Sequence, residues 1–147
     1  MSSIKFKLDN DQLADAFFED TLLMGIVAPM KDYQFSWHLN KMLGFDFRIN
    51  NSLEIPKINK KRKYFFNVFE YNIETMGMTH YLYNNQFDGD YLLPELKHLD
   101  FLWLIKDAQL STQELNELMQ SIRSVPGVQL VNEMTPDKII NKQFLIF

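Results

Sequence analysis

Two stretches of this sequence are apolar on both alternations of a strand, and they limit the fold more than any other feature. The first is residues 22–28, which Pro29 ends, and the second is residues 101–105. Because successive side chains of a strand point to opposite faces of its sheet, a strand that is apolar on both faces belongs in the middle of a sheet. We therefore expect two central strands. In the second, we expect Leu99, Phe101, Trp103 and Ile105 on one face and Leu102 and Leu104 on the other.

Two amphipathic segments predict the main helices. In the first, apolar residues recur at i, i+4, i+7 and i+8, and Gly44 suits the position just past the helix end. In the second, they recur at i, i+3, i+4 and i+7, Ser111 and Glu114 form a capping box, and Pro126 with Gly127 ends the helix. The periodic residues are Phe35, Leu39, Met42 and Leu43, and then Leu115, Leu118, Met119 and Ile122.

The remaining elements are shorter. An antiparallel hairpin is expected from residues 64–71 and 76–83, which are rich in aromatic and β-branched residues and flank a polar turn. We also expect an edge strand at 4–8, strands at 45–49, 128–131 and 144–147, and a loop at 84–90. Short helices are expected within 9–20 and after Thr135.

The order strand-helix-strand therefore occurs twice, with a hairpin between the two copies. This order predicts an α+β fold: a mostly antiparallel sheet with two main helices packed on one face, resembling a ferredoxin-like sandwich with extra strands. No linker or low-complexity segment divides the 147 residues, so we expect residues 1–147 to form a single domain.

Composition excludes several chemistries. The absence of cysteine excludes disulfides, thiolate catalysis, thiolate zinc sites and cysteine-held iron–sulfur clusters, and it fits a reducing compartment. The first residues lack the apolar core of a secretion signal, and the longest apolar run, 22–30, is too short to cross a bilayer. We expect a cytoplasmic protein with no membrane association. The 15 basic and 19 acidic residues give a formal charge of -4, which argues against general nucleic-acid binding.

The segment LPELKHLDF, residues 93–101, gathers a proline, two carboxylates and an imidazole. Glu95 and His98 are three residues apart, a spacing that some di-metal helix bundles use, but those sites need a second such pair, which this chain lacks. We interpret the segment as a turn whose acids bond to backbone amides and lead the chain into the strand at Phe101. A metal or catalytic site formed by Glu95, His98 and Asp100 is the competing hypothesis.

The same nine residues carry a resemblance. Pro94, Glu95 and Asp100 match the signature of the IPExxxVDY family of small bacterial proteins, and Leu93, Leu99 and Phe101 are close substitutes for its isoleucine, valine and tyrosine. The length and the apolar C-terminal residues are also similar. The resemblance implies membership of a bacterial family of unknown function, and it implies no catalytic role for any of these positions.

A basic segment stands directly before an aromatic one. The residues that would contact a nucleic acid are Lys57, Lys60, Lys61, Arg62, Lys63, Tyr64 and Phe66. Basic side chains can take up phosphate charge while aromatic rings stack on unpaired bases, so this segment favours single-stranded RNA as a ligand. The alternative is a solvated loop whose charges protect an aromatic strand from aggregation. We favour the second interpretation, since no RNA-recognition signature of glycine and aromatic residues is present.

Other motifs are weaker. Asp88, Gly89 and Asp90 read as a turn rather than a cation loop. His38 and His80 have no second ligand at metal spacing, and Met76, Met78 and His80 on one strand face are better explained as core. The five glycines form no phosphate-binding fingerprint, and no G-x-S-x-G is present.

These observations do not favour an enzyme, although they leave the question open. We expect no cofactor. We expect a domain that acts through protein–protein contact, including a homodimer, because aromatic strand surface is abundant and no reactive signature is present. The alternative function is an RNA-binding module that uses Lys57 to Phe66.

Overall fold

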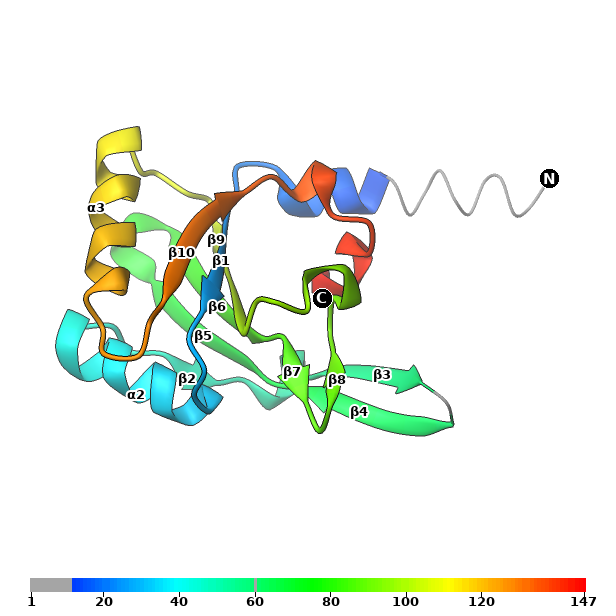
Figure 1. Ribbon diagram of the computed structural model, residues 1–147. Helices are drawn as coiled ribbons and strands as arrows, with labels where there is room; N and C mark the ends of the chain where they lie inside the picture. The colour runs from blue at the N-terminus through cyan, green and yellow to red at the C-terminus, as the bar shows by residue number, and fades with distance from the viewer. Residues whose placement is uncertain (1–11, 60) are drawn as a thin grey trace.

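The computed structural model of the protein describes residues 12–59 and 61–147, and one antiparallel sheet lies at its centre (Figure 1). The strand order is β10-β1-β9-β6-β5-β2, and every neighbouring pair is antiparallel. The strands are β1 (Leu22–Val27), β2 (Arg48–Ile49), β5 (Val68–Ile73), β6 (Met78–Asn84), β9 (Phe101–Lys106) and β10 (Leu130–Met134).

Two helices, α2 (Asp32–Leu43) and α3 (Thr112–Arg123), cover one face of the sheet (Figure 1). Each helix joins two strands that run in the same direction and have other strands between them. The predicted α+β class, with a mostly antiparallel sheet and two main helices on one face, is confirmed. The finer ferredoxin-like assignment stays a prediction.

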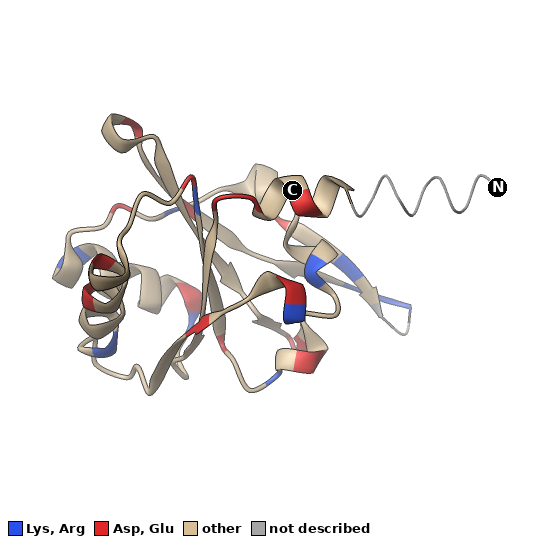
Figure 2. Cartoon of the chain, turned by 90° about the horizontal axis from the view of Figure 1, so that it is seen from above, with Lys and Arg blue, Asp and Glu red and all other residues tan. Residues whose placement is uncertain are grey.

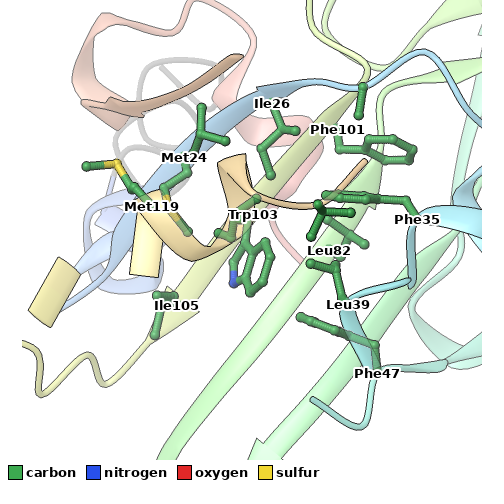
Figure 3. Packing of buried hydrophobic residues seen from close by; sticks show 14 of the residues in the cluster. Met24, Ile26, Phe35, Leu39, Phe47, Leu82, Phe101, Trp103, Ile105 and Met119 are labelled. Atoms are coloured by element: carbon green, nitrogen blue, oxygen red, sulfur yellow. The ribbon is translucent and has the colours of Figure 1, made fainter. Parts of the chain in front are cut away.

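The first core cluster lies between the helices and the sheet (Figure 3). Trp103 of β9 is fully buried at its centre, and the rings of Phe45 and Phe47 meet its indole edge-on at centroid distances of 5.3 and 5.0 Å. Those two rings explain why the strand expected at 45–49 is only the two-residue β2, since the chain turns Phe45 and Phe47 inward before it reaches the sheet edge. Further members include Met24, Ile26, Phe35, Leu39, Leu82, Phe101, Ile105 and Met119.

The second core cluster covers the opposite face of the sheet. Leu102 and Leu104 of β9 belong to it, so the expected two-sided burial of β1 and β9 is confirmed. Leu99 was expected on the face of Trp103 but packs in this second cluster, because it precedes the strand and lies in a turn. The cover consists of short segments: residues 12–18, which are helical, and the 3-10 turns η3 (Pro94–Leu96), η4 (Pro136–Lys138) and η5 (Lys142–Leu145).

The C-terminal strand expected at 144–147 is wrong. These residues include the end of η5, where Leu145 is fully buried and its carbonyl accepts a hydrogen bond of 2.7 Å from the hydroxyl of Tyr83. The apolar side chains therefore bury themselves from a turn that lies on the sheet, without pairing as a strand.

The end of α2 and the start of α3 are as the sequence predicts, while α3 ends at Arg123, shortly before the expected stop at Pro126 and Gly127. Gly44 follows α2 with a φ of 75°, a left-handed conformation that costs glycine little. Ser111 and Glu114 form both bonds of the capping box at the start of α3. Met42, however, was placed on the buried stripe of α2 and is about half exposed.

The middle of the chain differs most from expectation. Residues 64–71 form two strands rather than one: β4 (Arg62–Phe66) pairs with β3 (Ile55–Asn59) in a separate ribbon, and only β5 pairs with β6. The expected loop at 84–90 contains the small hairpin of β7 (Gln86–Phe87) and β8 (Asp90–Tyr91), and its turn is Asp88-Gly89, both with positive φ. Two further 3-10 turns are η1 (Asn51–Leu53) and η2 (Glu74–Met76).

The strand expected at 128–131 is present as β10, but it covers Leu130–Met134. The edge strand expected at 4–8 lies outside the described residues.

Strand β10 forms one edge of the six-stranded sheet. The guanidinium of Arg123, at the end of α3, donates a hydrogen bond of 2.6 Å to the carbonyl of Val131. A side chain thus occupies a backbone acceptor near the start of this edge strand. Within residues 12–59 and 61–147, every helix is too short or too polar to span a bilayer.

Candidate functional site

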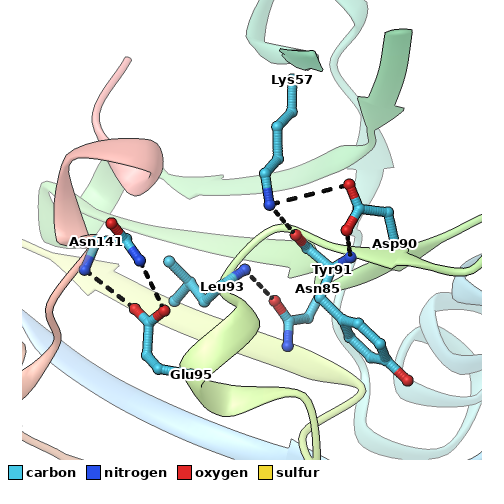
Figure 4. Close-up of polar contacts among 7 residues, drawn as sticks. All are labelled: Lys57, Asn85, Asp90, Tyr91, Leu93, Glu95 and Asn141. Carbon is cyan, nitrogen blue, oxygen red and sulfur yellow. Dashed lines mark hydrogen bonds and ion pairs between the residues drawn. The ribbon is translucent and has the colours of Figure 1, made fainter. Parts of the chain in front are cut away.

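The segment LPELKHLDF forms the turn η3, and its first carboxylate ties two distant parts of the chain together. Glu95 accepts hydrogen bonds from both the backbone N–H and the side-chain amide of Asn141, at 3.0 and 2.8 Å (Figure 4). Partial burial alone would raise the pKa of Glu95, but these bonds and the nearby charge of Lys57 lower it overall. Glu95 is therefore held ionised as a structural acceptor for the C-terminal segment.

The other two polar groups of this segment point elsewhere. The carboxylate of Asp100 accepts the backbone N–H of Ala28 at 2.8 Å, where β1 ends, while His98 is exposed. Glu95, His98 and Asp100 therefore do not converge. Among residues 12–59 and 61–147, no group of three histidine or acidic side chains is arranged to hold a metal ion. The interpretation that both acids bond to backbone amides is confirmed, with the difference that the amides belong to remote segments.

Asn85 holds the turn in place and was missed by the sequence analysis. It is fully buried, its side-chain amide donates to the carbonyls of Leu96 and Leu99 at 3.0 and 2.9 Å, and its carbonyl oxygen accepts the N–H of Leu93 at 2.9 Å (Figure 4). Its backbone N–H also donates to the carbonyl of Asp100. A buried asparagine inside an expected polar loop gives no local signal, because its partners are brought close only by the folded turn.

The basic segment lies on the β3–β4 ribbon, residues 55–66, which projects from the body of the molecule (Figures 1 and 2). Because side chains alternate along a strand, the predicted contact residues divide between its two faces. Phe66 is fully buried, and Tyr64 is half-buried and turned edge-on toward Phe87. Two of the rings expected to stack on bases are therefore directed into the molecule.

The predicted basic contacts divide in the same way. The ammonium of Lys57 is largely buried, donates to the carbonyl of Tyr91 at 2.6 Å and lies 4.0 Å from the carboxylate of Asp90 (Figure 4). Arg62 is exposed and pairs with Asp88 of the β7–β8 hairpin. Lys61 and Lys63 are exposed, while Lys60 lies outside the described residues. The ribbon is thus anchored along its inner face and open along its outer one.

Phe65 and Ile58 point outward, and both lie within the predicted segment 57–66 but were not among the predicted contact residues. Phe65 is 37% exposed with the ammonium of Lys63 5.0 Å from its ring centre, and Ile58 is 73% exposed. The register of β3 with β4 places Ile58 opposite Lys63. The alternation of inward and outward side chains along the ribbon could have identified them. It could be applied only once the pairing of 62–66 with 55–59 was known.

An open cleft of about 890 Å³ lies between the start of α2 and the β7–β8 hairpin. Its carboxylates are already engaged: Asp32 accepts from the amides of Asn67 and Asn84 at 2.8 and 3.3 Å, Asp88 pairs with Arg62, and Asp100 holds Ala28. The acidic groups of this cleft therefore link the start of α2 to the ends of β4 and β6, and the start of β9 to the end of β1.

The isolated histidines have separate surroundings. His80 is buried in the first core cluster, where its Nδ1 accepts the indole N–H of Trp103 at 2.9 Å, and burial lowers its pKa to about 4. Met78 is buried beside it as expected, whereas Met76 is exposed. His38 is half-buried on α2 with its ring against that of Trp37.

The outer face of α2 exposes large apolar side chains, and that of α3 does not. Tyr33 and Trp37, one turn apart, are 63% and 54% exposed, and the ammonium of Lys41 lies 4.7 Å from the centre of the Trp37 ring. On α3, which lies in the same layer, no large apolar side chain is exposed, and its outer positions hold glutamine, glutamate, asparagine and serine. Of the two helices in this layer, α2 is therefore the one whose outer face carries exposed aromatic side chains.

Comparison with known proteins adds no relative: no protein-family model matches the chain, and no curated protein matches it significantly.

Proposed function

We propose that this chain is a non-enzymatic domain that acts through protein–protein contact and forms a homodimer through the outer face of α2. The main support for this proposal is that Trp37 and Tyr33 are exposed on α2, while the outer face of α3 in the same layer is polar. Tryptophan and tyrosine are the side chains that most often dominate interface energies, because they bury large rigid area at low entropic cost.

The position of these rings supports an interface rather than incidental exposure. Tyr33, Trp37 and Lys41 follow one another at i, i+4 and i+8 along α2, so their side chains form a continuous stripe. Trp37 already packs against Lys41 and His38, which limits its rotamers before a partner arrives. A side chain that is ordered in advance loses less entropy on binding.

The experiment is size-exclusion chromatography with light scattering on the full chain over a concentration series. The unsubstituted protein should approach twice the mass of one chain as concentration rises, and Trp37→Glu should stay at the mass of one chain. Gln120→Glu, on the exposed face of α3, introduces the same charge and should behave like the unsubstituted protein. A strict monomer at every concentration, or a dimer that Trp37→Glu leaves unchanged, would contradict the proposal.

RNA binding is the second candidate. It is supported by the exposure of Lys61, Arg62 and Lys63 on a projecting ribbon, next to the partly exposed ring of Phe65. It predicts affinity for single-stranded RNA that falls steeply with salt, measured by fluorescence anisotropy with a labelled uridine oligonucleotide. If the reversal of Lys60, Lys61 and Arg62 to glutamate left that affinity unchanged, this candidate would be dropped.

Family and location are part of the same proposal. The resemblance of residues 93–101 to the IPExxxVDY signature supports a small bacterial protein of unknown function. The absence of cysteine supports a cytoplasmic location. The separate partners of Glu95 and Asp100 give no support to a shared metal or catalytic centre.

A further inference from the structure

The β3–β4 ribbon has two faces with different chemistry. Its inner face is fixed to the body by the buried Phe66 and Ile55 and by the bond from Lys57 to the carbonyl of Tyr91. Its outer face carries Pro56, Ile58, Lys63 and Phe65, which alternate with the inner residues in the register of the two strands. An ordered ribbon therefore presents a small apolar surface with an ammonium group in its midst.

The exposed apolar area on this face is concentrated. Ile58 is 73% exposed and stands opposite Lys63 across the ribbon, while Phe65 stands opposite Pro56. Isolated apolar side chains are common on protein surfaces, but apolar residues gathered on one projecting face among charges mark contact surfaces. Burying Ile58 and Phe65 against a partner would remove their exposed apolar surface from water and so favour binding.

The charge of the ribbon is opposite to that of the rest of the chain. Residues 57–63 hold five of the 15 basic residues and no acidic one. The remainder of the chain therefore holds ten basic and all 19 acidic residues, a formal charge of -9. In Figure 2 the basic segments stand out on the projecting ribbon, apart from the acidic segments of the body.

Part of this positive charge is available to a partner. Lys57 and Arg62 are engaged with Asp90 and Asp88. In the part of the chain that the structure describes, the ion pairs do not include Lys61 or Lys63, both of which are exposed. Two like-charged ribbons would repel each other, so a second copy of the ribbon is a poor occupant of this face.

We propose that the outer face of the β3–β4 ribbon docks an acidic segment of another protein in which carboxylates alternate with aliphatic side chains. Carboxylates would pair with Lys61 and Lys63, and an aliphatic side chain would pack on Ile58 and Phe65. This surface is separate from the α2 face and does not depend on the homodimer.

The geometry favours such a segment over single-stranded RNA. Bases need open aromatic faces on which to stack. Of the three rings of β4, Phe66 is buried and Tyr64 is turned inward, so Phe65 is the one ring of this strand that is open to a base. The most exposed apolar residue, Ile58, offers no ring at all.

The test is fluorescence anisotropy of the full chain with three labelled probes of equal length. The first is a peptide in which glutamate alternates with leucine, the second has glutamine in place of glutamate, and the third is a uridine oligonucleotide. The glutamate peptide should bind, the glutamine peptide should bind about 10-fold more weakly or not at all, and salt should weaken the first complex.

Variants locate the binding. Lys61→Glu with Lys63→Glu should weaken the glutamate peptide about 10-fold, and Ile58→Ser should weaken it by a smaller factor. Lys97→Glu with Lys138→Glu makes the same charge change at exposed positions outside the ribbon and should leave binding unchanged. Trp37→Glu should also leave it unchanged, which separates this proposal from the homodimer.

Three outcomes would overturn the inference: no binding of the glutamate peptide, equal loss in the ribbon and control variants, or tighter binding of the oligonucleotide with competition between the two probes. Circular dichroism confirms that each variant is folded. The substituted side chains are exposed, so the fold should tolerate them.

Discussion

Asn85 carries a larger share of the structure than its place in a polar stretch suggests. Its side chain is fully buried and bonds to the N–H of Leu93 and to the carbonyls of Leu96 and Leu99. Buried polar groups that lose their partner cost about 1 to 3 kcal/mol each. The turn around Pro94 therefore depends on one amide.

Replacing Asn85 with alanine should lower the free energy of unfolding by about 3 kcal/mol, because the buried N–H of Leu93 and the buried carbonyl of Leu99 lose the partner that Asn85 supplies. The carbonyl of Leu96 keeps the N–H of Leu99 as a donor. Asn84→Ala is the matched control. Asn84 is half-buried and its bond to Asp32 is long, at 3.3 Å, so the free energy of unfolding should fall by about 1 kcal/mol. Urea unfolding of both variants measures the difference. Equal losses would show that the turn does not rely on Asn85.

His80 should make stability depend on pH. An ordinary histidine has a pKa of 6.5, and burial lowers that of His80 to about 4 in the folded protein, so the unfolded chain binds the proton more readily. The contribution of neutral His80 is fully present above about pH 6.5 and is lost as the pH falls toward 4, by up to about 3 kcal/mol.

The measurement is the urea midpoint at successive pH values. His80→Gln should flatten the dependence between pH 6.5 and 4, while His98→Gln, at an exposed position, should keep it. If both variants followed the unsubstituted protein, another group would be responsible for the slope.

At this scale the sequence allowed only part of the site to be predicted. That Glu95 and Asp100 bond to backbone amides followed from the residue types and the proline before them. That the amides belong to Asn141 and Ala28 did not, because both lie more than 40 residues away in the chain. The role of Asn85 was likewise invisible, since its acceptors meet only in the finished turn.

Among the elements, those defined by local rules were predictable and those defined by pairing were not. Helices α2 and α3 followed from periodicity and caps that lie within the helix itself. The β3–β4 ribbon was missed because the one strand expected at 64–71 runs across Asn67, a single polar residue at which the chain leaves the ribbon and enters the sheet. The C-terminal residues misled for a related reason, since apolar side chains can be buried by a turn as well as by a strand.

The capping box of α3 gives a prediction for a single element. Ser111 Oγ accepts the N–H of Glu114 at 3.1 Å, and Glu114 accepts the N–H of Ser111 at 3.1 Å. Ser111→Ala should lower the free energy of unfolding by about 1 kcal/mol, while Thr112→Ala, at the next exposed position, should change it by less than about 0.5 kcal/mol. Thermal or urea unfolding measures both. Helix propensity would make Thr112→Ala neutral or stabilising, so an equal loss in both variants would show that the effect does not come from the cap.

The molecule as a whole has two cores that share one sheet. Leu104 and Ile105 are consecutive and fully buried, yet Leu104 packs in the second cluster and Ile105 in the first. A strand that belongs to both cores should make them unfold together. The single domain expected from the sequence would then be one cooperative unit.

Leu104→Ala and Ile105→Ala should each lower the free energy of unfolding by about 2 to 5 kcal/mol through the cavities they leave. Each variant should show one transition, with the same midpoint by tryptophan fluorescence and by far-ultraviolet circular dichroism, and an unchanged dependence on urea. Separate midpoints for the two probes in either variant would show that one core can open while the other stays folded.

The bond between Arg123 and Val131 has a consequence for how the protein behaves at high concentration. An open strand edge can pair with a strand from another molecule and so start a growing stack of hydrogen-bonded strands. The guanidinium occupies an acceptor that an incoming strand would need, so each new arrival must first displace it. Helix α3, which packs on one face of the sheet, thereby also hinders the edge strand β10 from acting as a template for fibres.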